Sequence, residues 1–385
     1  MNALPLRPAA ALLSRKALKH NLKTIRECIR KNSNLHRPDA EMMAVVKADA
    51  YGHDLQRVLP ELEKNGIKFF AVASLAEGLE ARKLSRKARI LVLGGTLEWS
   101  IEAARLAEKN RLEVAINDLR ALKYFLNHTK LLIHLKLDTG MNRLGIKPNE
   151  WSQAIAMIRN SKRSLEGLFT HFATYDDLVF YRQSMLFEEA VRWFFSAGIF
   201  PNSIHSENSA ALFSKNKIKK GILSEVTNLV RPGLAIYGYY NLGMSPDPKL
   251  KMRLAPVLEL VSEVGLLKQI EKSEGVSYGH LYKSLKSHSI GIVPLGYADG
   301  LSKTYAKDLQ PEWRSSSDRK KGVLNICGAI CMDMVMVRAK SGRLNTHDRV
   351  VFWGRFRNSL LENRIVEPYE LNLRIAKRIP RIWVP

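Results

Sequence analysis

Residues 43–53 read Met-Ala-Val-Val-Lys-Ala-Asp-Ala-Tyr-Gly-His. The short apolar run before Lys47 contains two β-branched valines and predicts a buried strand. Ala48, Ala50 and Gly52 leave room for a ligand close to the backbone. A lysine at the end of a buried strand is costly unless its charge is paired or neutralised, and a desolvated lysine can form a Schiff base with a carbonyl cofactor. The alternative is a lysine whose ammonium simply reaches solvent.

Strands and helices alternate along the chain around this stretch. Short apolar runs predict strands, and most are followed by a segment of helical periodicity. The strands predicted in this part of the chain are residues 12–14, 43–47, 69–73, 90–93, 112–116, 131–137, 165–172 and 200–205. This count predicts a (β/α)8 TIM-type barrel, whose active site lies at the carboxyl ends of the strands. A doubly wound open sheet is the alternative, but the sequence lacks its usual glycine-rich loop after the first strand.

The character of the sequence changes after about residue 240. Residues 241–251 are rich in proline, glycine and polar side chains and predict a linker. Beyond the linker, short strands separated by turns are predicted at residues 257–267, 289–294, 324–327, 334–337 and 349–353. We therefore expect a barrel at residues 12–240 and a smaller β-rich domain at residues 241–385, which residues 1–11 join.

The composition narrows the class of protein. The 385 residues carry a net charge of +24, which raises nucleic acid as a partner. The basic residues are spread over the whole chain without interleaved aromatics, so we expect no nucleic-acid partner and read the charge as general surface charge that attracts anions. Three cysteines provide no disulfide framework. No apolar run reaches the length of about 18 residues that a membrane helix needs, so we expect a cytoplasmic protein without membrane contact.

Polar side chains gather where the predicted strands end. They are Lys47, Lys136, Asp138, Arg143, His171, His205, Asn208, Ser209 and Arg231. Helix capping explains Ser209 well, but it explains lysines and arginines at these positions poorly. A series of such residues is what the active site of a barrel should produce.

Eight motifs, in order along nearly the whole chain, resemble those of the alanine racemases. They are residues 44–53, 137–145, 170–174, 205–211, 231–238, 276–279, 294–300 and 330–333. The resemblance implies a barrel followed by a β domain, and the interconversion of L-alanine and D-alanine, which supplies D-alanine for peptidoglycan. It also implies the cofactor pyridoxal 5′-phosphate, bound to Lys47 as a Schiff base.

Racemisation needs proton transfer on both faces of the substrate, and the resemblance implies two catalytic bases. Lys47 would act on one face and Tyr278 on the other, with Tyr278 supplied by the partner subunit of a homodimer. Tyrosine is a poor base at neutral pH unless neighbouring charge stabilises the phenolate. Arg231 matches the residue that faces the pyridine nitrogen. Because a guanidinium keeps its protons, that nitrogen would stay unprotonated and the ring would be a weaker electron sink.

The remaining site residues also follow from the resemblance. Arg143 would bind the phenolic oxygen of the cofactor and the substrate carboxylate, near Met332 and Asp333 of the partner subunit. Lys136 would support Arg143, either carbamylated or paired with Asp138. We expect no metal. The further cofactor-binding residues are Tyr51, His171, Asn208, Ser209, Gly233, Leu234 and Tyr369.

The sequence departs from the family pattern at two positions. Ala329 stands where arginine is common, and Asp54 stands where glycine is frequent.

Three alternatives for the function stay open: a racemase of another or broader amino-acid range such as serine, a decarboxylase of the same barrel class, and a non-catalytic protein that binds pyridoxal phosphate. The arginine at position 231 speaks against the decarboxylase.

Overall fold

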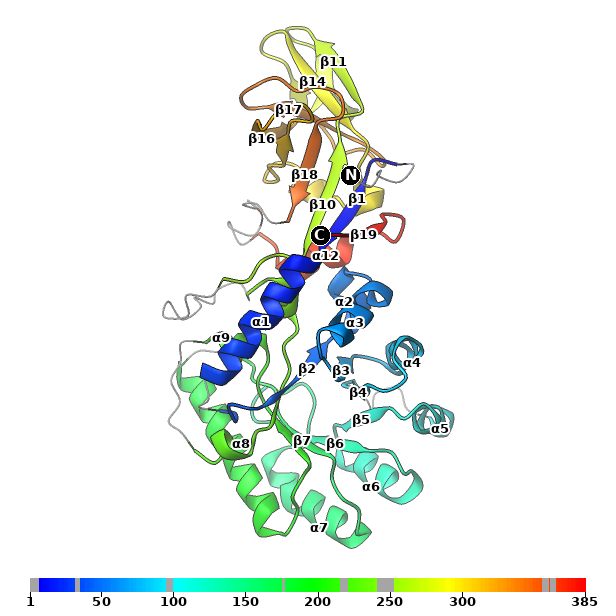
Figure 1. The fold of residues 1–385 in the computed structure, drawn as a ribbon, viewed down its shortest axis with the longest axis vertical. Helices are drawn as coiled ribbons and strands as arrows, with labels where there is room; N and C mark the ends of the chain where they lie inside the picture. Colours follow the sequence, from blue (N-terminus) through cyan, green and yellow to red (C-terminus); the bar gives the residue numbers. More distant parts are fainter. Residues whose placement is uncertain are drawn as a thin grey trace. The chain divides into compact units, whose positions relative to one another are not determined.

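The computed structural model describes residues 7–31, 35–94, 100–174, 177–214, 221–240, 253–354, 360 and 365–385 (Figure 1). The chain divides into two compact units. One runs from His20 to Ile236, and the other combines the residues up to Lys19 with the chain from Ala255 onward. No described helix is both long enough and apolar enough to cross a membrane.

The first unit contains a parallel sheet of eight strands in the order β8-β7-β6-β5-β4-β3-β2-β9. The sheet closes between its first and last strands through Asn228 N–H to Ile204 O at 3.2 Å and Arg231 N–H to Glu207 O at 2.8 Å. This arrangement confirms the predicted TIM-type barrel. The strands are β2 (Glu41–Val45), β3 (Phe69–Val72), β4 (Arg89–Val92), β5 (Glu113–Ile116), β6 (Ile133–Lys136), β7 (Gly167–Phe169), β8 (Ser203–His205) and β9 (Leu229–Val230).

Helices lie outside these strands (Figure 1). Side-chain caps explain where several begin: Ser74, Ser100 and Asp118 each accept a hydrogen bond from a backbone N–H of the first turn. The helices are α1 (Arg15–Lys31), α2 (Lys47–Gly52), α3 (Leu55–Lys64), α4 (Leu75–Leu84), α5 (Ile101–Lys109), α6 (Leu119–His128), α7 (Trp151–Ser161), α8 (Asp177–Ser196), α9 (Ser209–Phe213) and α10 (Leu223–Val226).

Side chains of alternating strand residues fill the barrel interior. Met43 and Val45 of β2, Phe69 and Ala71 of β3 and Leu229 of β9 belong to one buried cluster. Because side chains two residues apart lie on the same face of a strand, residues that share this numbering parity point inward. Lys47, two residues after Val45, continues this inward row.

One predicted barrel strand was wrong. The strand at residues 12–14 is part of β1 (Ala10–Ser14), which pairs with β10 (Leu258–Glu263) and β19 (Arg381–Val384) in the second unit. The eighth barrel strand is instead β9, which was not predicted because its two residues show no periodicity. Lys47 therefore follows the first strand of the barrel, not the second.

The second unit is rich in β-structure, as predicted. Its nine-stranded sheet has the order β11-β14-β17-β16-β15-β18-β10-β1-β19, and a separate hairpin pairs β12 with β13. Its core includes Leu260, Trp313, Val335 and Phe352. The further elements are β11 (Leu266–Ile270), β12 (Gly275–Val276), β13 (Tyr282–Lys283), β14 (His288–Val293), β15 (Glu312–Arg314), β16 (Lys321–Ile326), β17 (Val335–Ala339), β18 (Arg349–Trp353) and α12 (Pro368–Arg374).

Candidate active site

Lys47 lies just beyond the carboxyl end of β2 and is half-buried. Burial lowers the pKa of its ammonium, and the positive charge of Arg143 lowers that pKa further, whereas Glu77 opposes the change. A lysine with a lowered pKa is deprotonated more often and is therefore a better nucleophile and base.

The backbone after Lys47 forms a left-handed helical turn. Ala48, Asp49, Ala50 and Tyr51 all have φ between 51° and 55°. This conformation costs about 1–2 kcal/mol per residue for amino acids other than glycine. Hydrogen bonds offset part of that cost: the Ala48 N–H donates to Glu77 Oε1 at 2.8 Å, and the Asp49 carboxylate accepts from Leu55 N–H at 2.7 Å.

A second lysine, Lys136, ends strand β6 and is only 6% exposed. Burial, followed by the charges of Arg143 and Arg231, lowers its pKa to about 8. The following loop is organised by Asp138, whose carboxylate accepts from the N–H groups of Gly140 and Asn142 at 3.0 Å. This loop leads to Arg143, which is exposed.

Arg231 follows strand β9 and is 3% exposed. Its Nη1 donates to Nδ1 of His205 at 2.6 Å, and its Nη2 donates to the carbonyls of Thr170 and Ser206 at 2.7 and 3.0 Å. His171 follows β7; burial and the charge of Arg231 hold its pKa well below 6.5, so it is neutral at physiological pH.

Four cationic side chains thus surround the carboxyl end of the barrel, and each of them influences the pKa of a neighbour. They are Lys47, Lys136, Arg143 and Arg231. Such a cluster favours a ligand with several negative charges.

Backbone and hydroxyl groups form a small cradle beside this cluster. Ser209 Oγ accepts from the N–H groups of Gly233 and Ala235 at 2.9 and 3.1 Å. A Cβ atom at Gly233 would lie only 2.7 Å from the Tyr51 hydroxyl, so glycine keeps this space open. Asn208 caps α9 through its side-chain oxygen, and its Nδ2 lies 3.4 Å from His171 Nε2. Leu234, the residue after Gly233, is buried.

The second unit carries the remaining predicted residues. Tyr278, Met332 and Asp333 line one pocket of about 670 Å³. Tyr278 is 77% exposed and Met332 is 53% exposed. Tyr369, at 37% exposure, does not line this pocket.

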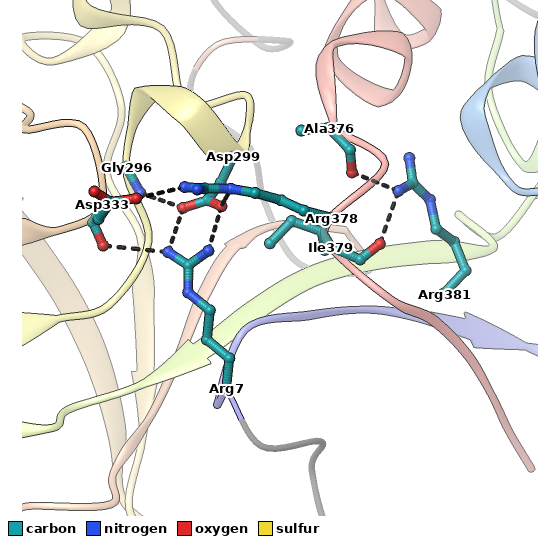
Figure 2. Close-up of polar contacts among 8 residues, drawn as sticks. All are labelled: Arg7, Gly296, Asp299, Asp333, Ala376, Arg378, Ile379 and Arg381. Carbon is teal, nitrogen blue, oxygen red and sulfur yellow. Dashed lines mark hydrogen bonds and ion pairs between the residues drawn. The ribbon is translucent and has the colours of Figure 1, made fainter.

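Two arginines anchor the segment that carries Met332 and Asp333 (Figure 2). The carboxylate of Asp299 is fully buried. It accepts hydrogen bonds from both Nη atoms of Arg7 at 2.6 and 2.7 Å and from Nε of Arg378 at 2.7 Å. Arg378 also donates to the Asp333 carboxylate at 2.7 Å. The N–H of Ala298 donates to Met332 O at 3.0 Å, so this cluster holds the pocket segment from two sides.

Family models match both parts of the chain. Residues 13–241 match the alanine racemase N-terminal domain, and residues 257–383 match the alanine racemase C-terminal domain. The chain belongs to the alanine racemase family. The alanine racemase of Treponema denticola is 32% identical over 410 residues, which cover 98% of this chain and 99% of that relative. The alanine racemase of Geobacter sulfurreducens is 31% identical and covers 98% of this chain and 97% of its own.

Solved alanine racemases share the fold. The structure from Clostridium difficile has a TM-score of 0.81 at 29% identity and covers 98% of this chain and 96% of that chain. The structure from E. faecalis has a TM-score of 0.81 at 26% identity, and each chain is covered completely. The likeness confirms the predicted architecture of a barrel followed by a β-rich domain.

Of the two departures from the alanine racemase pattern, Asp54 now has a structural explanation. It has φ of 72°, a conformation that favours glycine, and its carboxylate caps α3 by accepting from Gln56 N–H at 3.0 Å. Ala329 contributes its backbone carbonyl, which accepts from Ser277 Oγ at 3.0 Å.

Several residues beside the candidate site were not predicted from the sequence. Glu77 holds the left-handed turn, and its two oxygens accept from the N–H groups of Ala48 and Ala73. His134 and Glu113 lie inside the barrel below the cationic cluster. Strand parity could have revealed His134, because it precedes Lys136 by two residues on the same strand.

Among the residues that the structure describes, one group has donor atoms close enough for a metal: Glu113, His134 and Glu166. Arg89 already donates to both of these carboxylates. A guanidinium therefore provides the positive charge at this position.

Proposed function

We propose that this chain interconverts L-alanine and D-alanine, with pyridoxal 5′-phosphate held at Lys47. The observation that carries the proposal is the convergence of four cationic side chains and a backbone cradle at the carboxyl end of the barrel. Family membership supports the same activity.

The residues present fit this cofactor. A phosphate needs several hydrogen-bond donors in a confined space. The Tyr51 hydroxyl lies beside the space that a Cβ at Gly233 would fill. The Ser209 hydroxyl accepts from the Gly233 and Ala235 N–H groups and can donate its own proton to an anion. The aldehyde needs an amine of lowered pKa, which Lys47 supplies. Arg231 would face the ring nitrogen, and His171 and Asn208 would lie beside the ring. Leu234 and Tyr369 would complete the phosphate site.

The cofactor, when bound, withdraws electrons from the amino acid and thereby acidifies its Cα–H bond. Lys47 takes or returns a proton at Cα on one face, and the Tyr278 hydroxyl does so on the other. Arg231 can only donate, so the atom facing it must be a hydrogen-bond acceptor. Arg143 binds the substrate carboxylate through its forked donors.

We further propose a homodimer in which the pocket of Tyr278, Met332 and Asp333 completes the barrel site of the partner. The strong exposure of Tyr278 in the single chain supports this arrangement, because a catalytic side chain must be enclosed during reaction. All three cysteines are free thiols, which fits the reducing cytoplasm, where D-alanine for the cell wall would be made.

Lys136 supports Arg143 in this proposal. A pKa of about 8 leaves about one tenth of the amine neutral at pH 7, far more than an ordinary lysine has. Carbamylation by carbon dioxide needs that neutral form and would create an anion that pairs with Arg143. Pairing with Asp138 is the alternative.

A chiral assay of the purified protein tests the proposed function. With L-alanine, L-serine and L-lysine offered separately, we expect racemisation of alanine to be fastest. We expect Lys47→Ala to lose the visible absorption of bound cofactor and to slow racemisation on the order of 10³-fold, whereas Lys64→Ala, an exposed lysine on α3, should change neither. No racemisation of any of the three by protein that has bound the cofactor would refute the proposal.

A further inference from the structure

A row of buried polar side chains crosses the barrel interior from Arg231 to the opposite end of the strands. His205 Nε2 lies 3.0 Å from His134 Nδ1, and His134 Nε2 lies 2.8 Å from Glu113 Oε2. Arg89 donates to the Glu113 carboxylate through Nε at 2.6 Å and through Nη2 at 2.8 Å. Both histidines are fully buried, and Glu113 is 3% exposed.

The two ends of this row determine the direction of every hydrogen bond in it. Arg231 can only donate, so His205 Nδ1 must be the acceptor and carry no proton. The proton of His205 is then on Nε2 and points at His134 Nδ1, which accepts. His134 donates from Nε2 to the carboxylate of Glu113, which can only accept when ionised. Each ring is therefore neutral and has one defined tautomer.

Surrounding residues are shaped to hold the two rings. A Cβ atom at Gly167 would lie 1.9 Å from His134 Nδ1, so β7 needs glycine there for the ring to reach His205. His205 stacks on Phe169 with a centroid distance of 4.7 Å and an interplanar angle of 12°. The guanidinium of Arg231 lies over the same phenyl ring at 5.3 Å.

The surroundings of Glu113 keep its carboxylate ionised. Burial alone would raise the pKa of Glu113, but hydrogen bonds from His134 and Arg89 hold it below its ordinary value. Burial and the charge of Arg231 hold the pKa of His205 well below 6.5. The row thus joins an arginine at the pocket to an anion at the far end through two neutral rings.

We propose that His205, His134 and Glu113 form a one-way hydrogen-bond chain that positions the Arg231 guanidinium for the ring nitrogen of the cofactor. These three are positioning residues, because they act through Arg231. The assignment of the cofactor nitrogen rests on the proposed function, whereas the direction of the chain rests on the geometry alone.

Nitrogen NMR of the cofactor-free protein tests the direction. The protein is labelled with ¹⁵N-histidine. The signals of each ring are assigned as those that disappear in His134→Gln or in His205→Gln. We expect both rings to carry their proton on Nε2 and none on Nδ1 at pH 7.5. A proton on Nδ1 of either ring would overturn the proposal, whatever the activity of the protein.

The continuity of the chain is tested with a matched pair of variants. Glu113→Gln removes the carboxylate that ends the chain. Glu166→Gln removes a neighbouring carboxylate that accepts from Arg89 and Asn202 and forms no hydrogen bond with either histidine. We expect Glu113→Gln to shift the ring signals of both His134 and His205, and Glu166→Gln to leave those of His205 unchanged. An unmoved His205 in Glu113→Gln would overturn the proposal. If Glu113→Gln does not fold, Arg89→Lys replaces it, because Arg89 contacts Glu113 and is more exposed. In that variant the ring signals of His205 must shift.

The holoenzyme provides a second readout. Loss of an outer partner that orients a functional group typically costs about 10-fold or more, so we expect kcat for alanine to fall about 10-fold in Glu113→Gln with little change in KM. Glu166→Gln should retain kcat. An unchanged kcat in Glu113→Gln, with cofactor bound, would refute the positioning role. If the wild type does not racemise alanine, the proposed function fails, while the NMR result still decides the direction of the chain.

Discussion

In the proposed function, Lys47 has to remain available as an amine although it lies among cationic side chains that favour an anionic ligand. Burial and the charge of Arg143 both lower its pKa, so the amine loses its proton more readily than an ordinary lysine does. The same neighbours would attract an anionic cofactor. In the proposed site, one cluster of positive charge would therefore serve two purposes: it would activate the lysine and bind the ligand.

At the residue scale, Tyr278→Phe tests the second base. Enantiomers have equal free energies, so kcat/KM must fall equally in both directions. We expect the fall to be about 10²–10⁴-fold, the usual contribution of an acid–base group. The Cα-deuterium isotope effects of the two enantiomers should also become unequal, because only one of them loses its proton on the side of Tyr278. Unchanged rates with both enantiomers would show that Tyr278 is not a base.

The buried pair of His36 and Glu207 predicts a pH-dependent stability. Burial alone would lower the pKa of His36, but the Glu207 carboxylate raises it above 6.5. A raised pKa in the folded state stabilises the fold fully below pH 6.5, and this stabilisation is lost as pH rises through the folded-state value. We expect His36→Gln to lower the free energy of unfolding by about 2 kcal/mol at pH 5.5 and by less at pH 9. Urea titrations at both pH values measure the difference, and equal losses would contradict the assignment.

At the scale of the element, the turn of α2 is strained where it meets the proposed cofactor site. Four consecutive residues adopt the left-handed conformation, and Glu77 and Asp49 hold them there through backbone hydrogen bonds. Strain of this kind persists only when the surroundings impose it, and it is typical of functional sites. The turn brings Tyr51, four residues after Lys47, next to Gly233.

Substitution by glycine should have opposite effects in the two kinds of turn. Ala48→Gly relieves left-handed strain at a half-buried position, so we expect the free energy of unfolding to rise by about 0.5–1 kcal/mol. Ala103→Gly, in the right-handed helix α5, should lower it by about 1 kcal/mol. Chemical denaturation of the two variants provides the comparison. A loss of stability in Ala48→Gly would show that the turn is not strained in solution.

At the scale of the whole molecule, the proposed site draws on two chains. Complementation tests this directly. If Lys47→Ala and Tyr278→Phe subunits are unfolded and refolded together in equal amounts, about half of the dimers are mixed. Each mixed dimer has one site with both defects and one intact site, so about a quarter of wild-type activity should return. Recovery no greater than the sum of the two parent variants would mean that each site lies within one chain.

The strand pattern of the sequence by itself determined the barrel class, most of its strands and a set of polar candidates at the strand ends, whereas candidates such as Tyr278 and Tyr369 came from the resemblance to alanine racemases. Buried strands are local runs of apolar side chains, and strand ends in a barrel share one face, so linear order was sufficient. Only the tertiary structure decided that β1 belongs to the sheet of the second unit and that β9 closes the barrel. A short strand acquires its partners through long-range hydrogen bonds, which leave no local pattern. The left-handed turn and the row from Arg231 to Glu113 depend likewise on contacts between residues far apart in the chain.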